Sequence, residues 1–348
     1  MKFRKRFLGV ALILGLFSLS SCSINLLSDE PEVTTKIKEV TTEDYSVPTP
    51  QTEGDYQVTY VCNNGFTYIS KTTGLNKVLQ PDNPSKVCST FLGWYKDESC
   101  TQSFDFTKSV HEDTFVYAKW DTDLVSLVNE VSTTTIKSNI RIWITNYDKT
   151  GFGPMATMKN ASTSLGSGVI FYESNGYYYA LTNNHVVYTT TTYQTLTLED
   201  AYETKYEFDI LAKDAKYDLA IIRFKKGEEL EVASVANYTV PKNEVIFAMG
   251  EPNGLSNTVS MGYILGNKVF TPDSATLEMS NVTFSVYINS APIDSGSSGG
   301  ALIDSNLRLV GINFASAVDQ STGDFKYTYT IPIERVREFI TSYTTIEL

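Results

Sequence analysis

The chain beyond about residue 135 is a succession of short alternating or apolar runs separated by turn residues. Such runs predict β-strands, because successive side chains along a strand face opposite sides of a sheet. A helical period precedes the runs at 123–131 and follows them at 333–343. Many short strands with few helices predict a sandwich or a pair of β-barrels. We expect strands at 139–147, 166–173, 177–184, 207–214, 219–224, 244–250, 281–289, 307–315 and 325–332.

Residues 55–120 form a second region with its own pattern. Residues 56–61 alternate and end at a turn, and 91–106 and 114–120 add further strand-like pieces. In a unit this small, the large aromatic side chains must supply most of the core. They are Phe91, Trp94, Tyr95, Phe104, Phe106, Phe115, Tyr117 and Trp120.

The first 54 residues predict export rather than a folded domain. Residues 1–21 have a basic head followed by an apolar run that is too short to span a bilayer comfortably, which is typical of a secretory signal. Residues 22–54 are rich in Thr, Ser, Glu, Asp and Pro without a sustained apolar period. We expect a solvated tether there.

The charge of the chain argues against nucleic acid as a partner. The sequence holds 28 Lys and Arg against 40 Asp and Glu, a net charge of −12. Residues 1–21 contribute four positive charges and no negative ones, so the remainder carries −16. So acidic a surface repels phosphate backbones.

Three cysteines, Cys62, Cys88 and Cys100, lie close together in the chain that follows the tether. In an exported protein this predicts one disulfide with one thiol left over, and the pairing stays open. Their spacing does not suit a metal site, and His111 is the one histidine near them.

The candidate chemistry rests on His185, Asp218 and Ser298. His185 is the only histidine after the N-terminal module, and imidazole suits acid–base work near neutral pH. Asp218 opens an apolar run, where an unpaired carboxylate is costly. Ser298 lies in the Gly/Ser-rich stretch 294–302, which leads at once into a strand. We therefore interpret that stretch as a turn between core strands and not as a flexible spacer.

The order His, Asp, Ser along the chain is that of the chymotrypsin-type double barrel. Four blocks, at 166–187, 217–224, 249–266 and 288–315, resemble in order the protease domain of HtrA/Deg-type trypsin-like serine proteases. The resemblance implies a mainly β fold, with a chymotrypsin-like double β-barrel at 121–348. It also implies hydrolysis of peptide bonds through an acyl-enzyme, with no metal and no cofactor.

The resemblance assigns a role to each residue of the site. Ser298 attacks the carbonyl, His185 moves the proton, and Asp218 holds the imidazole tautomer. The main-chain N–H groups of Gly296 and Ser298 form the oxyanion hole.

A substrate pocket is implied by the same resemblance. Its walls are expected at 291–293, with Pro292 and Ile293, and at Asn313, Phe314 and Ala315. No acid is expected at its floor, and His111 lies in another module, so neither Lys/Arg nor Glu selectivity is favoured. A small or medium apolar substrate side chain fits best.

Two features depart from the HtrA pattern. Ser297 stands where HtrA proteases usually have Asn and digestive proteases have Asp. Without a carboxylate there, we expect no activation step in which a new N-terminus inserts beside it. Only 50 residues follow Ser298, so we expect no PDZ domain after the barrels.

Two further resemblances concern the N-terminal third. Residues 19–22 resemble the lipobox of bacterial lipoproteins, which implies a lipid on Cys22 and attachment to the outer face of the cell membrane. The segments 91–95, 104–106 and 117–120 resemble the Listeria–Bacteroides repeat, a small β-grasp-like module of bacterial surface proteins. That resemblance assigns 55–120 to a spacer or to a surface contact with a partner.

We therefore expect a surface-anchored serine endopeptidase acting on proteins or peptides. The competing interpretation is a non-catalytic surface adhesin that uses a protease-like fold for binding. The complete set His185, Asp218 and Ser298 argues against it, because a binding protein has little need for all three.

Overall fold

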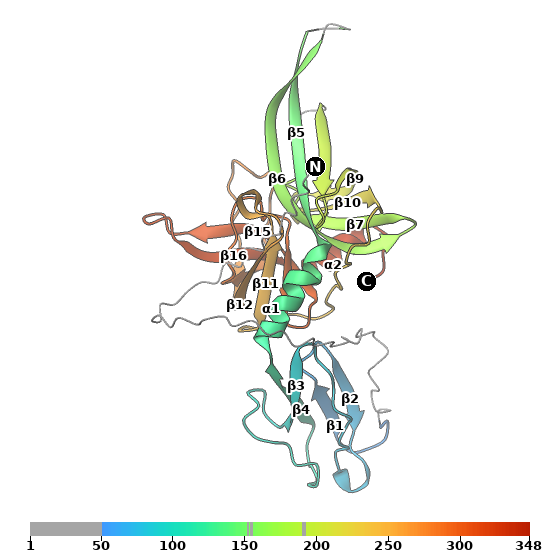
Figure 1. Cartoon of the computed structure of the whole chain (residues 1–348). Coiled ribbons are helices and arrows are strands. Elements are labelled where there is room, and N and C mark those ends of the chain that lie inside the picture. Colours follow the sequence, from blue (N-terminus) through green and yellow to red (C-terminus); the bar gives the residue numbers. More distant parts are fainter. Residues whose placement is uncertain (1–50, 152, 154–155, 190–192) are drawn as a thin grey trace, which may run out of the picture. The chain divides into compact units, whose positions relative to one another are not determined.

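The computed structural model describes residues 51–151, 153, 156–189 and 193–348. The expected signal sequence, Cys22 and most of the expected tether lie outside these described residues. The chain divides into two compact units at Asp123 and Leu124, and each is mainly β (Figure 1). None of the helices in the described ranges has the length and apolar character needed to cross a membrane.

The smaller unit is a four-stranded sheet in the order β2-β1-β4-β3. The central pair β1 and β4 is parallel, and both outer pairs are antiparallel. A single turn of 3-10 helix follows β2 at Gly74–Asn76. The strands are β1 (Gln57–Val61), β2 (Thr67–Lys71), β3 (Ser89–Tyr95) and β4 (Thr114–Thr122).

Aromatic rings fill one side of this sheet. Trp94 is buried and meets Phe91 and Tyr60 edge to face, with ring centroids 5.5 Å and 5.8 Å apart. Phe115, which we expected in the core, is 51% exposed and stacks on Tyr117 instead. Successive side chains of a strand face opposite sides of the sheet. Val116 and Ala118 of β4 face the core, so Phe115, next to Val116, faces the other side.

The expected disulfide does not form among the described cysteines. Cys62 and Cys100 are buried thiols. Burial raises the pKa of Cys62 to about 11 and also raises that of Cys100. Both therefore act as small apolar core residues.

The larger unit contains two closed six-stranded barrels, the double barrel that the sequence predicts (Figure 1). The first closes in the order β10-β7-β6-β5-β8-β9 and the second in the order β11-β12-β13-β16-β15-β14. The first barrel is built from β5 (Asn139–Thr150), β6 (Thr157–Ser174), β7 (Tyr177–Thr182), β8 (Gln194–Glu199), β9 (Lys205–Asp214) and β10 (Leu219–Lys225). The second is built from β11 (Val245–Gly250), β12 (Thr258–Val269), β13 (Ser285–Asn289), β14 (Ala301–Asp304), β15 (Leu309–Val318) and β16 (Phe325–Pro332).

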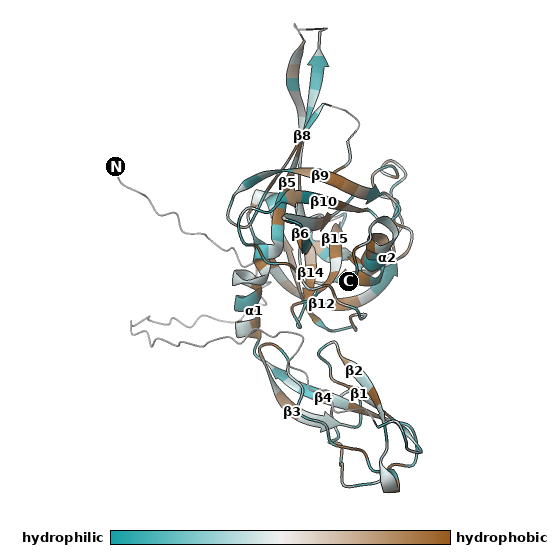
Figure 2. Cartoon of the chain, turned by 90° about the vertical axis from the view of Figure 1, so that its right-hand side faces the viewer, coloured by the Kyte–Doolittle hydropathy of each residue, from teal (hydrophilic) through white to brown (hydrophobic). Residues whose placement is uncertain are grey.

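Each barrel has its own apolar interior. Ile140, Ile142 and Ile144 of β5 alternate into the first, as the period of two requires. Beyond the barrel, β5 and β6 continue as a paired hairpin to Thr150 and Thr157, and one strand of its far end is hydrophilic (Figure 2).

Two α-helices flank the barrels, close to the ranges that the sequence predicts. Helix α1 (Leu124–Thr133) precedes the first barrel and buries Leu127 and Val131, four residues apart on one face. Helix α2 (Ile333–Tyr343) follows β16 and buries Ile333, Val336, Phe339 and Ile340. Both helices pack through one apolar stripe.

Candidate active site

The three predicted catalytic residues lie on loops of the two barrels. His185 follows β7 and Asp218 immediately precedes β10, so both belong to the first barrel. Ser298 lies on the turn before β14 of the second barrel. The main-chain N–H of Ser167, on β6, donates to the carbonyl of Ser298 at 2.8 Å. This bond fixes the serine turn against the first barrel.

Asp218 is a fully buried carboxylate that accepts two hydrogen bonds from one residue. Its Oδ2 lies 2.8 Å from Nδ1 of His185, and its Oδ1 accepts the His185 main-chain N–H at 3.0 Å. Because a carboxylate can only accept, Nδ1 carries the proton and Nε2 is left as the basic nitrogen. The geometry prepares the imidazole to accept a proton on Nε2.

The backbone of Asp218 is unusual. Its φ is +51°, a left-handed conformation that Asp and Asn tolerate better than other side chains. The side chain of Asn183 donates to the Asp218 carbonyl at 2.9 Å and holds the turn. Asp218, just before β10, is thus hydrogen-bonded through both its carboxylate and its main-chain carbonyl.

The hydroxyl of Ser298 donates to the carbonyl of Phe314 at 3.4 Å, a long bond. It makes no hydrogen bond to His185 among the described residues. Catalytic bonds are often long or unaligned before substrate binds, and one rotation about the Ser298 side chain changes this partner.

The turn around Ser298 leaves two main-chain donors open. The N–H groups of Ser295 and Ser297 bond to Oδ1 and to the carbonyl of Asp294, at 2.7 Å and 2.9 Å. Those of Gly296 and Ser298 make no hydrogen bond within the described part of the chain. These are the two donors that the sequence predicts for an oxyanion hole.

Glycine is required twice in this turn. Gly296 and Gly299 have φ of +98° and +86°. A Cβ on Gly299 would also overlap the carbonyl oxygen of Ser167 and the hydroxyl of Thr182. The stretch is therefore a fixed turn in which each Gly meets a steric demand.

Of the expected pocket walls, Phe314 contacts Ser298 through its carbonyl. Phe314 is buried against the ring of Phe270, with centroids 4.9 Å apart. The side chain of Asn313 turns inward, where it accepts from Thr330 at 2.7 Å and donates to the Ala301 carbonyl at 2.9 Å. Pro292, Ile293 and Ala315 are half-buried. The pocket itself stays a prediction.

Three residues that our sequence analysis did not single out support this turn. The hydroxyl of Ser167 donates to the Gly296 carbonyl at 2.7 Å and accepts the main-chain N–H of Glu251 at 3.0 Å. Glu251 is 2% exposed and pairs with the guanidinium of Arg141 on β5 at 2.7 Å. Burial raises the pKa of Glu251, while hydrogen bonds from Asn257 and the charge of Arg141 act in the opposite direction.

Comparison with known proteins gives these observations a family. Residues 166–312 match the trypsin-like peptidase domain family, over the same strands and loops that hold His185, Asp218 and Ser298. The chain carries a trypsin-like peptidase domain. The peptidase domain is of the HtrA type, and one Listeria–Bacteroides repeat domain, matched at residues 56–119, precedes it. The resemblances to the HtrA-type protease domain and to the Listeria–Bacteroides repeat are thus confirmed.

Several curated relatives of this peptidase domain are similar over part of their length. A probable periplasmic serine endoprotease, DegP-like, from Buchnera aphidicola is 30% identical over 260 residues, 72% of this chain and 52% of that protein. Periplasmic serine endoprotease DegP from Escherichia coli is 31% identical over 179 residues, 50% of this chain and 34% of that protein. The chain thus spans about a third to a half of the length of these relatives.

Among solved structures, the Rv3671c protease from M. tuberculosis in its active form has the same fold. It superposes with a TM-score of 0.50 and 19% identity, over 65% of this chain and 88% of that one. The double β-barrel of the peptidase domain therefore shares the fold of that protein.

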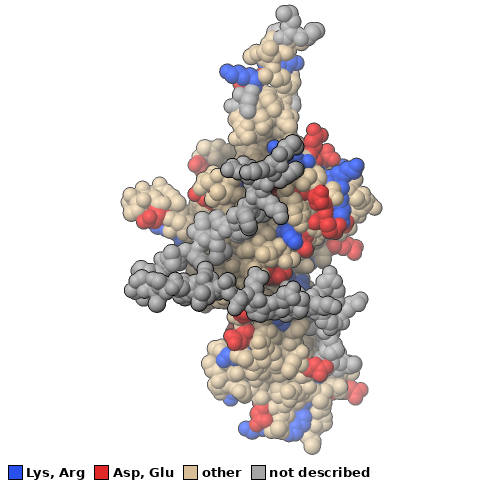
Figure 3. Space-filling model, viewed as in Figure 1, with Lys and Arg blue, Asp and Glu red and all other residues tan. Residues whose placement is uncertain are grey.

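The described residues contain no group of three or more His, Cys, Asp or Glu side chains suited to a metal ion. Acidic and basic side chains are interspersed on the face of the molecule drawn in Figure 3. No broad basic patch is visible among the described residues of that face.

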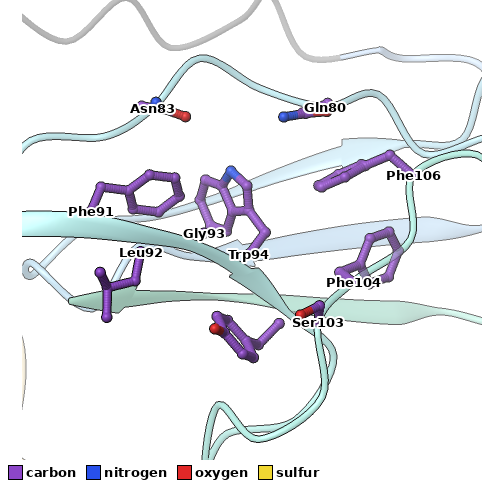
Figure 4. Close-up of a pocket in the computed structure, with 10 residues that line it drawn as sticks. Gln80, Asn83, Phe91, Leu92, Gly93, Trp94, Ser103, Phe104 and Phe106 are labelled. Atoms are coloured by element: carbon purple, nitrogen blue, oxygen red, sulfur yellow. The ribbon is translucent and has the colours of Figure 1, made fainter. Parts of the chain in front are cut away.

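A concave site lies within the repeat domain. It is a pocket of about 450 Å³, and the amides of Gln80 and Asn83 face the ring of Trp94 across it (Figure 4). The buried indole Nε1 of Trp94 has no hydrogen-bond partner among the described residues. The other lining residues are Phe91, Leu92, Gly93, Tyr95, Ser103, Phe104 and Phe106.

Proposed function

We propose that this chain is a serine endopeptidase that cleaves protein or peptide substrates through Ser298, His185 and Asp218. The observation that carries the proposal is the buried Asp218 carboxylate, bonded at 2.8 Å to Nδ1 of His185. A buried carboxylate in that position orients an imidazole for proton transfer. The serine endoproteases among the relatives support the same activity.

The proposed reaction follows from the geometry. Ser298 Oγ turns from Phe314 and attacks the scissile carbonyl, while Nε2 of His185 takes its proton. Asp218 stabilises the imidazolium, which then protonates the leaving amine. Water, activated by the same imidazole, hydrolyses the acyl-enzyme and restores Ser298. The open N–H groups of Gly296 and Ser298 stabilise the oxyanion in both steps.

The experiment that tests this activity is cleavage of an unfolded probe protein, β-casein, by the purified chain. We expect cleavage by the unaltered chain and none above background with Ser298→Ala. Casein left intact by the unaltered, folded chain would contradict the proposal and favour the adhesin alternative.

We further propose that the chain is exported and held by a lipid on Cys22 at the outer face of a bacterial cell membrane. The signal pattern at 1–21 and the lipobox-like residues 19–22 support this proposal, as do relatives named as periplasmic. Cys22→Ala should release the protein from the membrane fraction. Retention of this variant on membranes would contradict lipid anchoring.

The repeat domain, 55–120, is proposed to contact a partner at the cell surface through the pocket of Figure 4. The unpaired Trp94 donor and the Gln80 and Asn83 amides support this role, because they can bind a polar group among aromatic rings. Gln80→Ala with Asn83→Ala should lower binding of the whole chain to sedimented cell envelopes while cleavage of casein is unchanged. Unchanged binding would contradict the proposal.

A further inference from the structure

The segment Glu251–Asn257, which joins β11 to β12, lies against the turn that carries the nucleophile. Asn253 makes two hydrogen bonds across this contact. Its main-chain N–H donates to the Ser295 carbonyl at 2.7 Å, and its side-chain Nδ2 donates to Oδ2 of Asp294 at 2.8 Å. Both acceptors come from the two residues just before Gly296.

The first of these bonds fixes which way the Ser295–Gly296 peptide faces. The described chain contains no cis peptide, so the C=O and N–H of this unit point in opposite directions. Because the Ser295 carbonyl is turned toward Asn253, the Gly296 N–H is turned away from Asn253. That N–H is one of the two open donors of the turn.

The next peptide is held in the same way. The Gly296 carbonyl accepts the hydroxyl of Ser167 at 2.7 Å, and the N–H of the same peptide, on Ser297, bonds to the Asp294 carbonyl at 2.9 Å. Both carbonyls that flank the Gly296 N–H are therefore occupied. Neither can turn into the space where an oxyanion forms without losing its hydrogen bond.

Asn253 itself adopts a demanding backbone. Its φ and ψ are 53° and 27°, between Pro252 and Gly254, whose φ is +77°. Asn is among the few side chains that occupy this left-handed region readily. The side chain is exposed, so it contributes no core packing, and its visible contribution is the bond to Asp294.

The segment that carries Asn253 is anchored in the first barrel. The Glu251 carboxylate accepts from Arg141 Nε at 2.9 Å and from Asn139 Nδ2 at 2.7 Å, both on β5. It also accepts the Asn257 N–H at 2.9 Å, which closes the segment on itself.

The Arg141 guanidinium makes further contacts with the same segment. It bonds to the Gly254 carbonyl at 3.1 Å and to the hydroxyl of Ser256. A displacement of this segment would therefore require breaking buried charged contacts.

We propose that Asn253 is a positioning residue that holds the Ser295–Gly296 peptide in the orientation in which the Gly296 N–H faces the oxyanion. This inference rests on the proposed peptidase function. The side-chain bond to Asp294 keeps the Asn253 main chain in place, so that its N–H can hold the Ser295 carbonyl. When the side-chain bond is lost, the main-chain bond weakens, and the peptide can rotate to present the Ser295 carbonyl, an acceptor, where catalysis needs a donor.

Two substitutions at Asn253 separate the effect of its side-chain hydrogen bond from that of its backbone conformation. Asn253→Ala removes the Nδ2 donor and strains the backbone at φ +53°, whereas Asn253→Gly removes only the Nδ2 donor. Asn243→Ala is the matched control. Asn243 is also exposed, has φ of +69°, and donates its N–H to the Ile264 carbonyl, and the described structure gives it no contact with the Ser298 turn.

The kinetic constants for a fluorogenic peptide, chosen from a casein cleavage site, give the first readout. Removal of one oxyanion donor costs about 10²–10³ in kcat, so we expect Asn253→Ala to lower kcat by about 10- to 100-fold. KM should change by less than about twofold, because the interaction acts mainly on the transition state. Asn253→Gly should fall in between, and Asn243→Ala should leave both constants unchanged.

Inhibition by a peptide aldehyde gives a second readout that a loss of fold stability would not mimic. Its adduct with Ser298 places an oxyanion in the hole, so its inhibition constant should rise with Asn253→Ala about in parallel with the loss of kcat. Equal values for Asn253→Ala and Asn243→Ala would overturn the proposal. If Asn253→Ala fails to fold, Asn253→Gly decides, and unaltered kcat there overturns it. Absence of cleavage by the unaltered chain would instead refute the peptidase function.

Discussion

The Asp218 carboxylate receives both the ring Nδ1–H and the main-chain N–H of His185, at 2.8 Å and 3.0 Å, while it is fully shielded from water. The pair fixes the imidazole in two ways, because one bond sets the ring tautomer and the other ties the loop that carries the ring. The buried carboxylate serves this purpose only as long as it can accept both hydrogen bonds.

Asp218→Asn therefore tests the pair without disturbing the backbone. Asn tolerates the φ of +51° at this position, but its amide favours the wrong imidazole tautomer. We expect kcat to fall by about 10⁴-fold. The melting temperature should shift by only a few degrees, measured on the same preparation. A loss of kcat below about tenfold in the folded variant would contradict the assigned role of Asp218.

Gly299→Ala tests whether the nucleophile turn needs space as well as backbone freedom. A Cβ there overlaps Ser167 and Thr182, so we expect a loss of about 2–4 kcal/mol in the free energy of unfolding and a severe loss of cleavage. Gly323→Ala is the control, because its φ is +77° but no atom lies within 4 Å of the added Cβ. Strain alone should cost it about 1 kcal/mol. Equal losses in the two variants, measured by urea unfolding, would refute the steric account.

Glu251→Gln tests the charged anchor between the barrels. It leaves the Arg141 guanidinium, whose side chain is 14% exposed, with Glu199 at 3.4 Å as its remaining carboxylate. Breaking a buried pair on one side is costly, and we expect about 2–4 kcal/mol less stability. The control is Asp209→Asn, which breaks the more exposed ion pair between Asp209 and Arg223 of the first barrel. It should cost below about 1 kcal/mol. The account fails if the two losses, compared by urea unfolding, are alike.

The Cys62 thiol should be protected from alkylation in the folded chain. Its pKa is raised by burial from 9.0 to about 11, so the neutral thiol persists at pH 8 and the reactive thiolate is about 100-fold scarcer. Because the pKa of Cys62 is raised, alkylation by iodoacetamide should accelerate as the pH rises toward 11. Unfolding in urea should remove the protection. Mass spectrometry follows the label. A Cys62–Cys100 disulfide in the purified protein would contradict the buried thiols.

The alternating pattern of the sequence predicts most of the strands, and the strands that it does not predict were missed for physical reasons. The runs at 139–147, 177–184, 219–224 and 325–332 predict β5, β7, β10 and β16 within a few residues. Strand β8 was not predicted, because it is part of a Thr-rich polar stretch and alternates weakly. Strand β12 was not predicted either, since Gly262 and Gly266 interrupt its apolar residues.

The site was readable only where chemistry depends on residue type. A lone histidine, an aspartate before an apolar strand and a serine among glycines indicate their roles, because few other side chains supply that chemistry. Ser167 and Asn253 could not be found in this way. They act through main-chain partners that lie 129 and 42 positions away in the sequence, and no local pattern marks such contacts.

Ser297 illustrates the same limit. It is 2% exposed, and its N–H belongs to the turn that Asp294 closes. The sequence shows only that the residue departs from the HtrA pattern. In the structure Ser167 and Asn253 bond to the turn, and the absence of an activation step that inserts a new N-terminus stays a prediction. Proteolytic activation by removal of residues 1–120 would contradict that proposal.

The central claim, that Ser298 is an activated nucleophile, is tested most directly by a fluorophosphonate probe on the folded, purified chain. The account predicts one covalent phosphonyl adduct, located by peptide mass spectrometry on Ser298, absent from Ser298→Ala and strongly slowed in Asp218→Asn. An unlabelled chain, or labelling that persists in Ser298→Ala, would contradict it.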